Sequence, residues 1–149
     1  MGWQAIPVSL SSSKQASWLQ LAAYIAWRNP RVRNLTQYVW IDEPLGKSGS
    51  GWQSGLRYRD GRAKRALGSF PHPFWATRTS GSRVRLWGQV RPGGAETVTL
   101  ERKAGSGWKK IASVKTSGRG YFKRDITARG KGTYRFRYSG GTSSAKSVR

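Results

Sequence analysis

From Arg83 to Val90 the chain reads RVRLWGQV, and this stretch decides the fold that the sequence predicts. Apolar Val84 and Leu86 alternate with charged Arg83 and Arg85. Successive side chains of a β-strand point to opposite faces, so this alternation is typical of a strand that buries one face. We therefore expect a half-buried strand here.

Similar short runs continue to the end of the chain, separated by turns rich in Gly, Ser and Pro. They span residues 96–102, 108–115, 120–126, 132–138 and 143–148. Regularly spaced short strands predict a small antiparallel sandwich. The side chains expected to face inward are Val84, Leu86, Val98, Leu100, Ile111, Val114, Phe122, Tyr134 and Phe136. Those expected to face outward are Arg83, Arg85, Lys109, Lys115, Lys123, Arg135 and Arg137.

The first half of the chain has a different pattern, which begins with a helix over residues 11–28. Ser12 and Gln15 fit a capping box at its start. An apolar stripe at i, i+3, i+4 and i+7 then predicts the buried face, made by Trp18, Leu21, Ala22 and Ile25 and widened by Leu19, Ala23 and Ala26. Asn29-Pro30 ends the helix, because proline disfavours α geometry in the residue before it.

After the helix we expect a buried strand over 34–41, formed by the apolar run in Gln37–Pro44. Helix, short loop and buried strand make the second half of a βαβ unit, whose first strand would be missing or reduced to residues 3–8. The rest of this half is expected to form a loop at 46–51, a strand at 52–58, a turn at Asp60-Gly61, a short helix at 62–67 and an extended linker at 70–76.

The predicted fold class is therefore α+β, with two domains at residues 1–79 and 80–149. Their charges differ: residues 1–79 carry 11 basic and 3 acidic side chains, a net charge of +8, and residues 80–149 carry 17 and 3, a net charge of +14. The whole chain, at +22, is expected to attract polyanions such as acidic cell-wall polymers or nucleic acid. The alternative is a solvated basic surface without a partner.

Composition excludes several kinds of site. The chain has no cysteine, so disulfides, thiolate zinc sites and cysteine nucleophiles are excluded. Its one histidine, His72, lies between two prolines and leaves almost no material for a histidine metal cluster or a Ser-His-Asp triad. We expect no cofactor and no metal. No apolar run is long enough for a transmembrane helix, and no signal peptide is expected at the start.

Several motifs resemble the C-terminal end of cellulase-like glycoside hydrolases, which are (β/α)₈ barrels. The likeness is carried by residues 28–33, 37–42, 52–56 and 60–66, together with the opening Gly2-Trp3-Gln4. The resemblance implies that residues 1–79 form a partial barrel segment of helix, strand, hairpin and short helix. It also implies that both catalytic glutamates of the family precede Met1, so this chain would be a truncated, non-catalytic part of a secreted enzyme that hydrolyses O-glycosyl bonds.

The second half resembles the Ig-like or fibronectin-like modules appended to secreted bacterial enzymes. The likeness lies in residues 87–92, 98–102 and 107–112. The combined resemblance implies an extracellular protein whose partner is a polysaccharide, and we expect a monomer. A hypothesis of another class is a cationic β-sandwich that binds an anionic cell-wall polymer; nucleic acid is a less favoured partner, because no known binding motif is present.

Three residues are candidates for sugar binding. In the resembling enzymes an aromatic residue at the end of the eighth strand stacks on a sugar, which implies that role for Trp40; the alternative is a core residue. Asp42 would hydrogen-bond sugar hydroxyls or serve as a turn carboxylate, and Trp52 would line the same rim or pack beneath the loop. Asp42 and Glu43 are neighbours, and on a strand they would point to opposite faces, so they do not make a catalytic pair.

Overall fold

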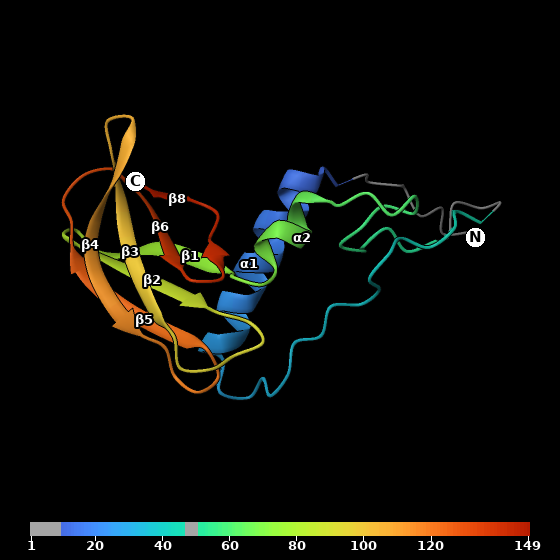
Figure 1. Cartoon of the computed structure of the whole chain (residues 1–149), viewed down its shortest axis with the longest axis horizontal. Helices are drawn as coiled ribbons and strands as arrows, with labels where there is room; N and C mark the ends of the chain where they lie inside the picture. The colour runs from blue at the N-terminus through green and yellow to red at the C-terminus, as the bar shows by residue number, and fades with distance from the viewer. Residues whose placement is uncertain (1–9, 47–50) are drawn as a thin grey trace, which may run out of the picture.

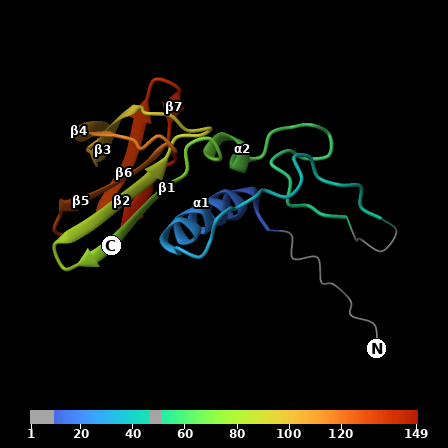
Figure 2. The same ribbon diagram turned by 90° about the horizontal axis from the view of Figure 1, so that it is seen from below.

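The computed structural model describes residues 10–46 and 51–149. The first strand predicted at 3–8 lies outside these residues, as does most of the predicted 46–51 loop. The elements are α1 (Ser12–Arg28), α2 (Arg65–Ser69), β1 (Phe74–Ser80), β2 (Arg83–Gln89), β3 (Thr97–Ala104), β4 (Gly107–Lys115), β5 (Tyr121–Thr127), β6 (Gly132–Tyr138), β7 (Gly141–Thr142) and β8 (Lys146–Val148). Figures 1 and 2 show a β-sandwich with α1 lying beside it.

Two antiparallel sheets form the sandwich. One has the order β1-β2-β5, and the other has the order β4-β3-β6-β7 with β8 also paired to β6. The core between them contains aromatic and aliphatic side chains from both sheets: Phe74, Val84, Leu86, Val98, Leu100, Phe122, Tyr134 and Phe136. The prediction of an antiparallel β-sandwich is confirmed.

For one residue, Ile111, the alternation pattern predicts the wrong face of the strand. Ile111 is 37% exposed, while Ala112 beside it packs against the core. The pairing register shifts here, because Leu100 pairs with Ala112 and Glu101 with Lys110. Ile111 is thus the extra residue of a β-bulge, and a bulge reverses the side to which the following residues point.

The partial barrel is not formed in this structure. Residues 34–41 make no strand, and neither do residues 52–58. The β-pairing of these residues consists of two isolated bridges, a parallel one between Ile41 and Arg57 and an antiparallel one between Arg57 and Ala63. Val39 has a φ of 55°, which a β-branched residue in a strand does not adopt. The apolar run therefore lacks both the partner strands and the backbone geometry of a buried strand.

The helix predicted over 11–28 is confirmed, but its buried face agrees with the predicted one only in part: Ala23 is buried, and Leu19 and Leu21 pack against buried residues. Ser11 caps it by accepting a hydrogen bond from Lys14 N at 3.3 Å. The buried residues are Ala16, Gln20, Ala23 and Tyr24, whereas Trp18 and Ile25 are more than half exposed. Apolar residues occur all around this helix, so periodicity alone did not identify the face that packs on the sandwich.

That face lies on the outer surface of the β1-β2-β5 sheet. Tyr24 stacks near Trp27 and Trp75, with ring centroids 6.1 and 6.4 Å away, and it covers the fully buried Trp87 at 5.5 Å. The buried Gln20 side chain donates to Ala16 O at 3.0 Å and accepts from Phe74 N at 3.4 Å. A polar residue is therefore tolerated in this contact because both ends of its amide are bonded.

β1 occupies much of the segment that was predicted as a linker. Pro71 and Pro73 suggested extended backbone without pairing, but Phe74–Ser80 pairs antiparallel with β2. Phe74 faces the core between the sheets, and Trp75 on the opposite side of β1 faces α1. Both faces of this edge strand are therefore covered. The division into 1–79 and 80–149 stays a prediction, although β1 precedes that boundary and α1 packs on its sheet.

His72 connects α2 to β1 and packs against the end of the core. Its ring lies edge-on to Phe136 and Tyr138, with centroids 6.5 and 6.2 Å away, and its Nδ1 is buried without a hydrogen-bond partner among the described residues. Burial lowers the pKa of His72 below its ordinary value of 6.5, and a hydrogen bond with the Gly68 backbone offsets part of this effect.

We expect the protein to lose stability as the pH falls below 6.5, because the unfolded chain then binds a proton that folded His72 resists. The variant His72→Phe should remove this loss between about pH 6.5 and about pH 5 while retaining the aromatic contacts. Urea denaturation at a series of pH values measures it. Hydrogen bonds from arginine hold the pKa values of Asp60 and Asp125 below the ordinary value of 3.8, so these two groups affect stability only at lower pH. Equal slopes for wild type and variant in this window would contradict the prediction.

Candidate functional site

The three predicted site residues lie in the segment that joins α1 to α2. This segment has little regular structure, and backbone hydrogen bonds between its two arms hold it together. Trp40 O accepts from Leu56 N and Arg57 N, both at 3.0 Å, and Asp42 N donates to Arg57 O at 3.1 Å. The arms are also attached to α1, because Gln15 Nε2 donates to Ser54 O and Gly55 O at 2.9 Å.

Asp42 is buried at the centre of this segment. Its Oδ1 accepts from Lys64 Nζ at 2.7 Å and from Gly55 N at 3.0 Å, and both charged side chains are nearly inaccessible. Lys64 Nζ also donates to Gln53 O at 2.9 Å. In this arrangement Asp42 fixes the distance between the two arms, and its carboxylate is already occupied by protein donors. The sugar contact suggested for Asp42 stays a prediction.

Gly55 is required beside this ion pair. A Cβ at Gly55 would lie 2.6 Å from Asp42 N and 2.8 Å from Ile41 C, which are backbone atoms that cannot move aside independently. The close approach of the two arms therefore depends on a residue without a side chain.

Trp52 is exposed and firmly positioned. Its backbone N donates to Glu43 Oε2 at 3.0 Å, and its O accepts from Glu43 N at 3.0 Å. The indole is 61% exposed and meets the ring of Tyr38, itself 62% exposed, edge-on at a centroid distance of 5.9 Å. Sequence reasoning missed Tyr38, although it lies two residues before Trp40 in the same aromatic run.

Trp40 is also exposed, at 54%, so it is not the core residue of the alternative interpretation. The guanidinium of Arg57 lies 6.0 Å from its ring centroid. This distance is at the limit of a cation–π contact. Tyr38, Trp40 and Trp52 are called the loop aromatics below. Whether Trp40, Asp42 and Trp52 bind sugar is not decided by their positions.

The carboxylates do not form a catalytic pair. All six acidic residues belong to the described part of the chain, and most have basic or backbone partners. Glu101 pairs with Arg135 at 2.7 Å and Arg137 at 3.5 Å. The hydrogen bond from Arg85 lowers the pKa of Asp125. In residues 10–46 and 51–149, no group of three or more His, Cys, Asp or Glu side chains is arranged to hold a metal.

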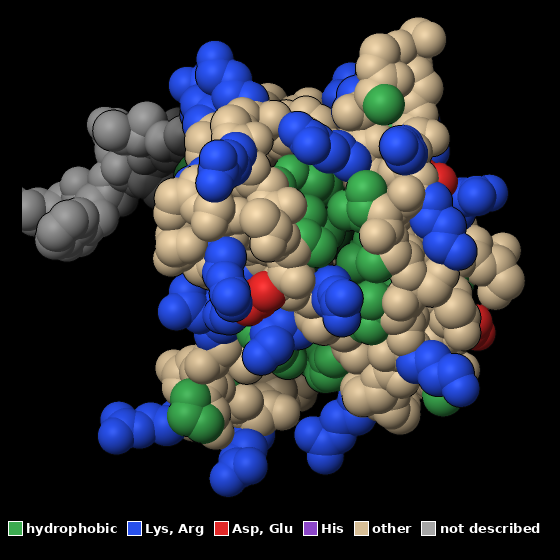
Figure 3. Space-filling view, turned by 90° about the vertical axis from the view of Figure 1, so that its left-hand side faces the viewer, with side chains coloured by type: hydrophobic (Ala, Val, Ile, Leu, Met, Phe, Trp, Pro, Cys, Tyr) green, Lys and Arg blue, Asp and Glu red, His purple; other side chains and the backbone are tan. Residues whose placement is uncertain are grey.

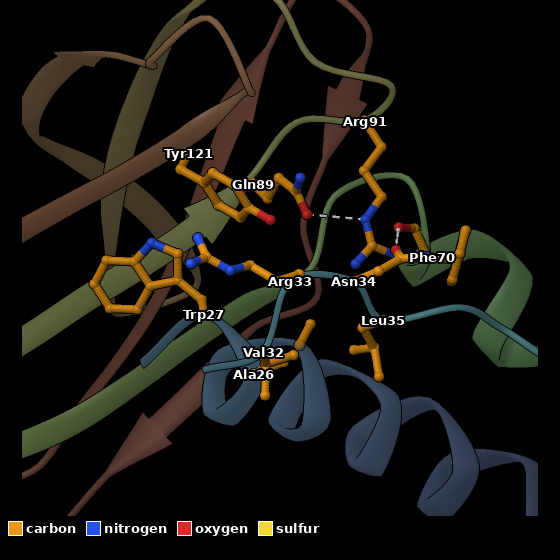
Figure 4. Close-up of a pocket in the computed structure, with 11 residues that line it drawn as sticks. Ala26, Trp27, Val32, Arg33, Asn34, Leu35, Phe70, Gln89, Arg91 and Tyr121 are labelled. Carbon is orange, nitrogen blue, oxygen red and sulfur yellow. Dashed lines mark hydrogen bonds between the residues drawn. The ribbon is translucent and has the colours of Figure 1, made fainter. Parts of the chain in front are cut away.

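A separate cleft of about 320 Å³ lies where the end of α1 meets the sandwich. Figure 4 shows the residues that line it, with Arg33 and Arg91 entering from different elements. Its rim is formed by the chain after α1, and its floor by side chains of β2 and β5. None of the loop aromatics lines it. Among the described residues, no helix has the length and apolar character needed to cross a membrane.

We expect Lys64→Met to destabilise the protein strongly, by about 3–5 kcal/mol in the free energy of unfolding, because Asp42 would be left as an uncompensated buried charge. The double variant Asp42→Leu/Lys64→Met should recover part of that loss, since no buried charge remains. Urea denaturation of both variants measures this coupling. As a control, Arg62→Met breaks the exposed pair with Asp60 and should change stability little. A double variant no more stable than Lys64→Met would contradict a role for the pair as described.

Comparisons with known proteins place the chain in no family. No family model matches it, and no curated protein matches it either. Among solved structures, it is similar to a superoxide reductase (neelaredoxin) E23A from Ignicoccus hospitalis, with a TM-score of 0.43 and 10% identity over 56% of this chain and 85% of that chain. It is also similar to the structure "FN3tt mut" (TM-score 0.37, 18% identity, 50% and 84% covered). A third is a family 56 carbohydrate-binding module described as a β-1,3-glucan binding domain (TM-score 0.37, 22% identity, 52% and 98% covered). Likeness at this level carries no argument about function.

Proposed function

We propose that this chain is a non-catalytic, polysaccharide-binding part of an extracellular glycoside hydrolase, and that it binds sugar through the loop aromatics. The observation that carries the proposal is the pair of exposed rings of Tyr38 and Trp52, held in edge contact at 5.9 Å. Large exposed rings are unfavourable in water unless a partner covers them, and the flat apolar face of a pyranose is suited to an indole or phenol ring.

The rings are held in place before any ligand binds. Glu43 fixes the backbone of Trp52 through two hydrogen bonds, and Ser54 Oγ donates to Tyr38 O at 3.2 Å. The buried pair Asp42–Lys64 connects the arms that carry them. A ligand therefore meets a preformed surface, and little conformational entropy is lost on binding. On this proposal Asp42 is a positioning residue.

The proposal that the chain is non-catalytic is supported by the positions of its acidic side chains. Hydrolysis of a glycosidic bond needs two carboxyl groups that face one substrate. Asp42 is buried under Gly55 and Lys64, Glu43 bonds to the Trp52 backbone, and Asp60 bonds to Arg62. The remaining three acids belong to the sandwich.

The glycoside hydrolase part of the proposal is supported by the distribution of apolar surface. Of the ten large hydrophobic side chains that are exposed in the described chain, nine lie between Trp18 and Trp52 and one, Ile111, in the sandwich. A segment that packs against further barrel elements would have such a surface, and the exposed Trp18 and Ile25 on α1 are part of it. Because residues 28–66 resemble the end of a cellulase-like barrel, the proposed partner of this surface is the rest of such a barrel.

A direct test compares Trp52→Ala and Tyr38→Ala with Trp18→Ala, whose side chain is equally exposed at 55% but lies on α1. Affinity electrophoresis in gels containing soluble β-glucan, xylan or mannan measures retention. Loss of a stacking ring should weaken binding to the recognised polysaccharide roughly tenfold, because such rings dominate sugar contacts. Trp18→Ala should bind like wild type. Retention that falls equally in all three variants, or in none, would refute the role of the loop aromatics.

A second candidate function is binding of an anionic polymer by the outer face of the β4-β3-β6 sheet. Here Arg135 stacks over Trp108 at 4.1 Å, and Lys103 lies 5.3 Å from the same ring. Glu101 is the acidic residue paired with this group, and it neutralises only part of the charge of Arg135 and Arg137. Figure 3 shows Lys and Arg side chains spread over the side of the sandwich that carries β4 and β5, with hydrophobic side chains exposed between them.

Salt distinguishes the two functions. If the basic face binds polyanions, retention on a DNA or teichoic-acid resin should fall roughly tenfold or more between 50 and 200 mM NaCl, because released counterions drive such binding. Retention by the neutral polysaccharide should change little over the same range, since stacking is not screened. The variant Lys103→Gln/Arg137→Gln should lower polyanion retention while leaving polysaccharide retention unchanged. Polyanion binding that is insensitive to salt and to this variant would exclude the basic face.

A further inference from the structure

The cleft between α1 and the sandwich contains an arrangement of arginines that the proposed sugar surface does not use. Its polar lining consists of Arg33 and Asn34 from the chain after α1, Gln89 from β2, and Arg91 just beyond β2. Trp27 and Tyr121 supply aromatic walls. Figure 4 shows that these side chains come from the helix, the following segment and the sheet, with Arg33 extending toward Trp27 and Arg91 toward Phe70.

Arg91 is held rigidly in this cleft. Its Nε donates to Gln89 Oε1 at 2.9 Å, its Nη1 donates to Phe70 O at 3.1 Å, and its guanidinium stacks over the Phe70 ring at 4.4 Å. All of these partners are neutral. Within residues 10–46 and 51–149, its Nη2 has no hydrogen-bond acceptor. Burial lowers the pKa of Arg91, since the cation is partly removed from water.

No protein carboxylate neutralises this charge. All six acids of the chain are described, and none forms a salt bridge with Arg33 or Arg91 in the described structure. A second cation in the same cleft makes the arrangement less favourable, because like charges repel. A fixed guanidinium with a free N–H edge, in a cleft that a second arginine also lines, offers the charge and the donors that bind carboxylate and phosphate groups.

We propose that this cleft binds an oxyanion group, a carboxylate or a phosphate, carried by a polar molecule of about monosaccharide size. The volume of about 320 Å³ is at the small end of ligand sites and leaves room for one ring. Arg91 and Arg33 bind the charged group, the amides of Asn34 and Gln89 meet hydroxyls, and Trp27 or Tyr121 packs on the ring. This proposal does not rest on sugar binding by the loop aromatics, because no residue is shared between the two sites.

A purely structural role for Arg91, as a tie between Phe70 and Gln89, is the competing explanation for its position. A substitution at Arg33 distinguishes oxyanion binding from this structural explanation. Arg33 is exposed and has no hydrogen-bond or ion-pair partner in the described chain, so it has no structural contact to lose. The matched control is Arg31, which lies two residues earlier, is also exposed and does not line the cleft. Arg33→Gln and Arg31→Gln remove the same charge from the chain, so non-specific attraction falls equally in both.

The experiment titrates D-glucuronate, inorganic phosphate and D-glucose into wild type and both variants at 150 mM NaCl, using calorimetry and the fluorescence of Trp27 and its neighbours. We expect saturable binding of at least one anion, and much weaker binding of neutral glucose. Arg33→Gln should weaken anion binding roughly tenfold, the loss of one charge-assisted hydrogen bond, while Arg31→Gln binds like wild type.

The relative affinities for glucuronate and phosphate indicate which kind of molecule carries the oxyanion. Glucuronate tighter than phosphate indicates an acidic sugar, and phosphate equal or tighter indicates a phosphate group; both support the site. Three results overturn it: no saturable binding of either anion, glucose bound as tightly as glucuronate, or equal effects of Arg33→Gln and Arg31→Gln. Retained polysaccharide binding by Arg33→Gln would show that the loop aromatics act separately.

Discussion

Trp87 projects from the outer face of the three-stranded sheet, and Tyr24 of α1 covers it at a ring-centroid distance of 5.5 Å. Trp27 lies 5.7 Å and Tyr121 6.1 Å from the same indole. The indole Nε1 is buried without a hydrogen-bond partner among the described residues, which costs stability. The apolar area that these rings bury together outweighs that cost, and it attaches the helix to the sandwich. Without this contact, the first half of the chain has no fixed position.

The two candidate sites follow from that attachment. The end of α1 brings Trp27 and the following residues against β2 and β5, which creates the cleft that holds Arg91. The start of α1 holds the segment between the helices, because Gln15 bonds to Ser54 and Gly55, and Ser12 Oγ accepts from Arg65 N at 2.8 Å. One helix thus positions the loop aromatics at its beginning and the arginine cleft at its end.

The sandwich was predictable because the sequence features that specify it, in each strand and each turn, are local. Strands with one buried face show alternation, and the turns between them show Gly and Pro, so six strand positions agree with the structure to within a few residues. The errors have physical causes outside that pattern. Ile111 lies at a bulge, β1 follows two prolines, and the burial of Gln20 depends on a backbone amide 54 residues away.

The candidate sites were less predictable, since their properties depend on contacts between distant residues. Trp40 and Trp52 were singled out by type, but the exposure of Tyr38 and the burial of Asp42 are set by how the two arms pair. No sequence pattern marks Arg33 and Arg91 as neighbours, since a helix end and a sheet edge bring them together. In a chain of net charge +22, most basic side chains are solvated, and what distinguishes these two is that they share a confined space without an acid.

The two halves of the molecule differ in where their apolar side chains lie. The sandwich buries most of its apolar side chains between its sheets. The exposed apolar and aromatic side chains between Trp18 and Trp52 lie on α1 and in the segment after it, which has little regular structure. Surfaces of that kind are retained when something covers them, either a ligand or the rest of a larger enzyme. The loop aromatics are held in place by Glu43 and the Asp42–Lys64 pair, whereas Trp18 and Ile25 lie on a helix face without such supports, so the two parts of this apolar surface differ in how firmly they are positioned.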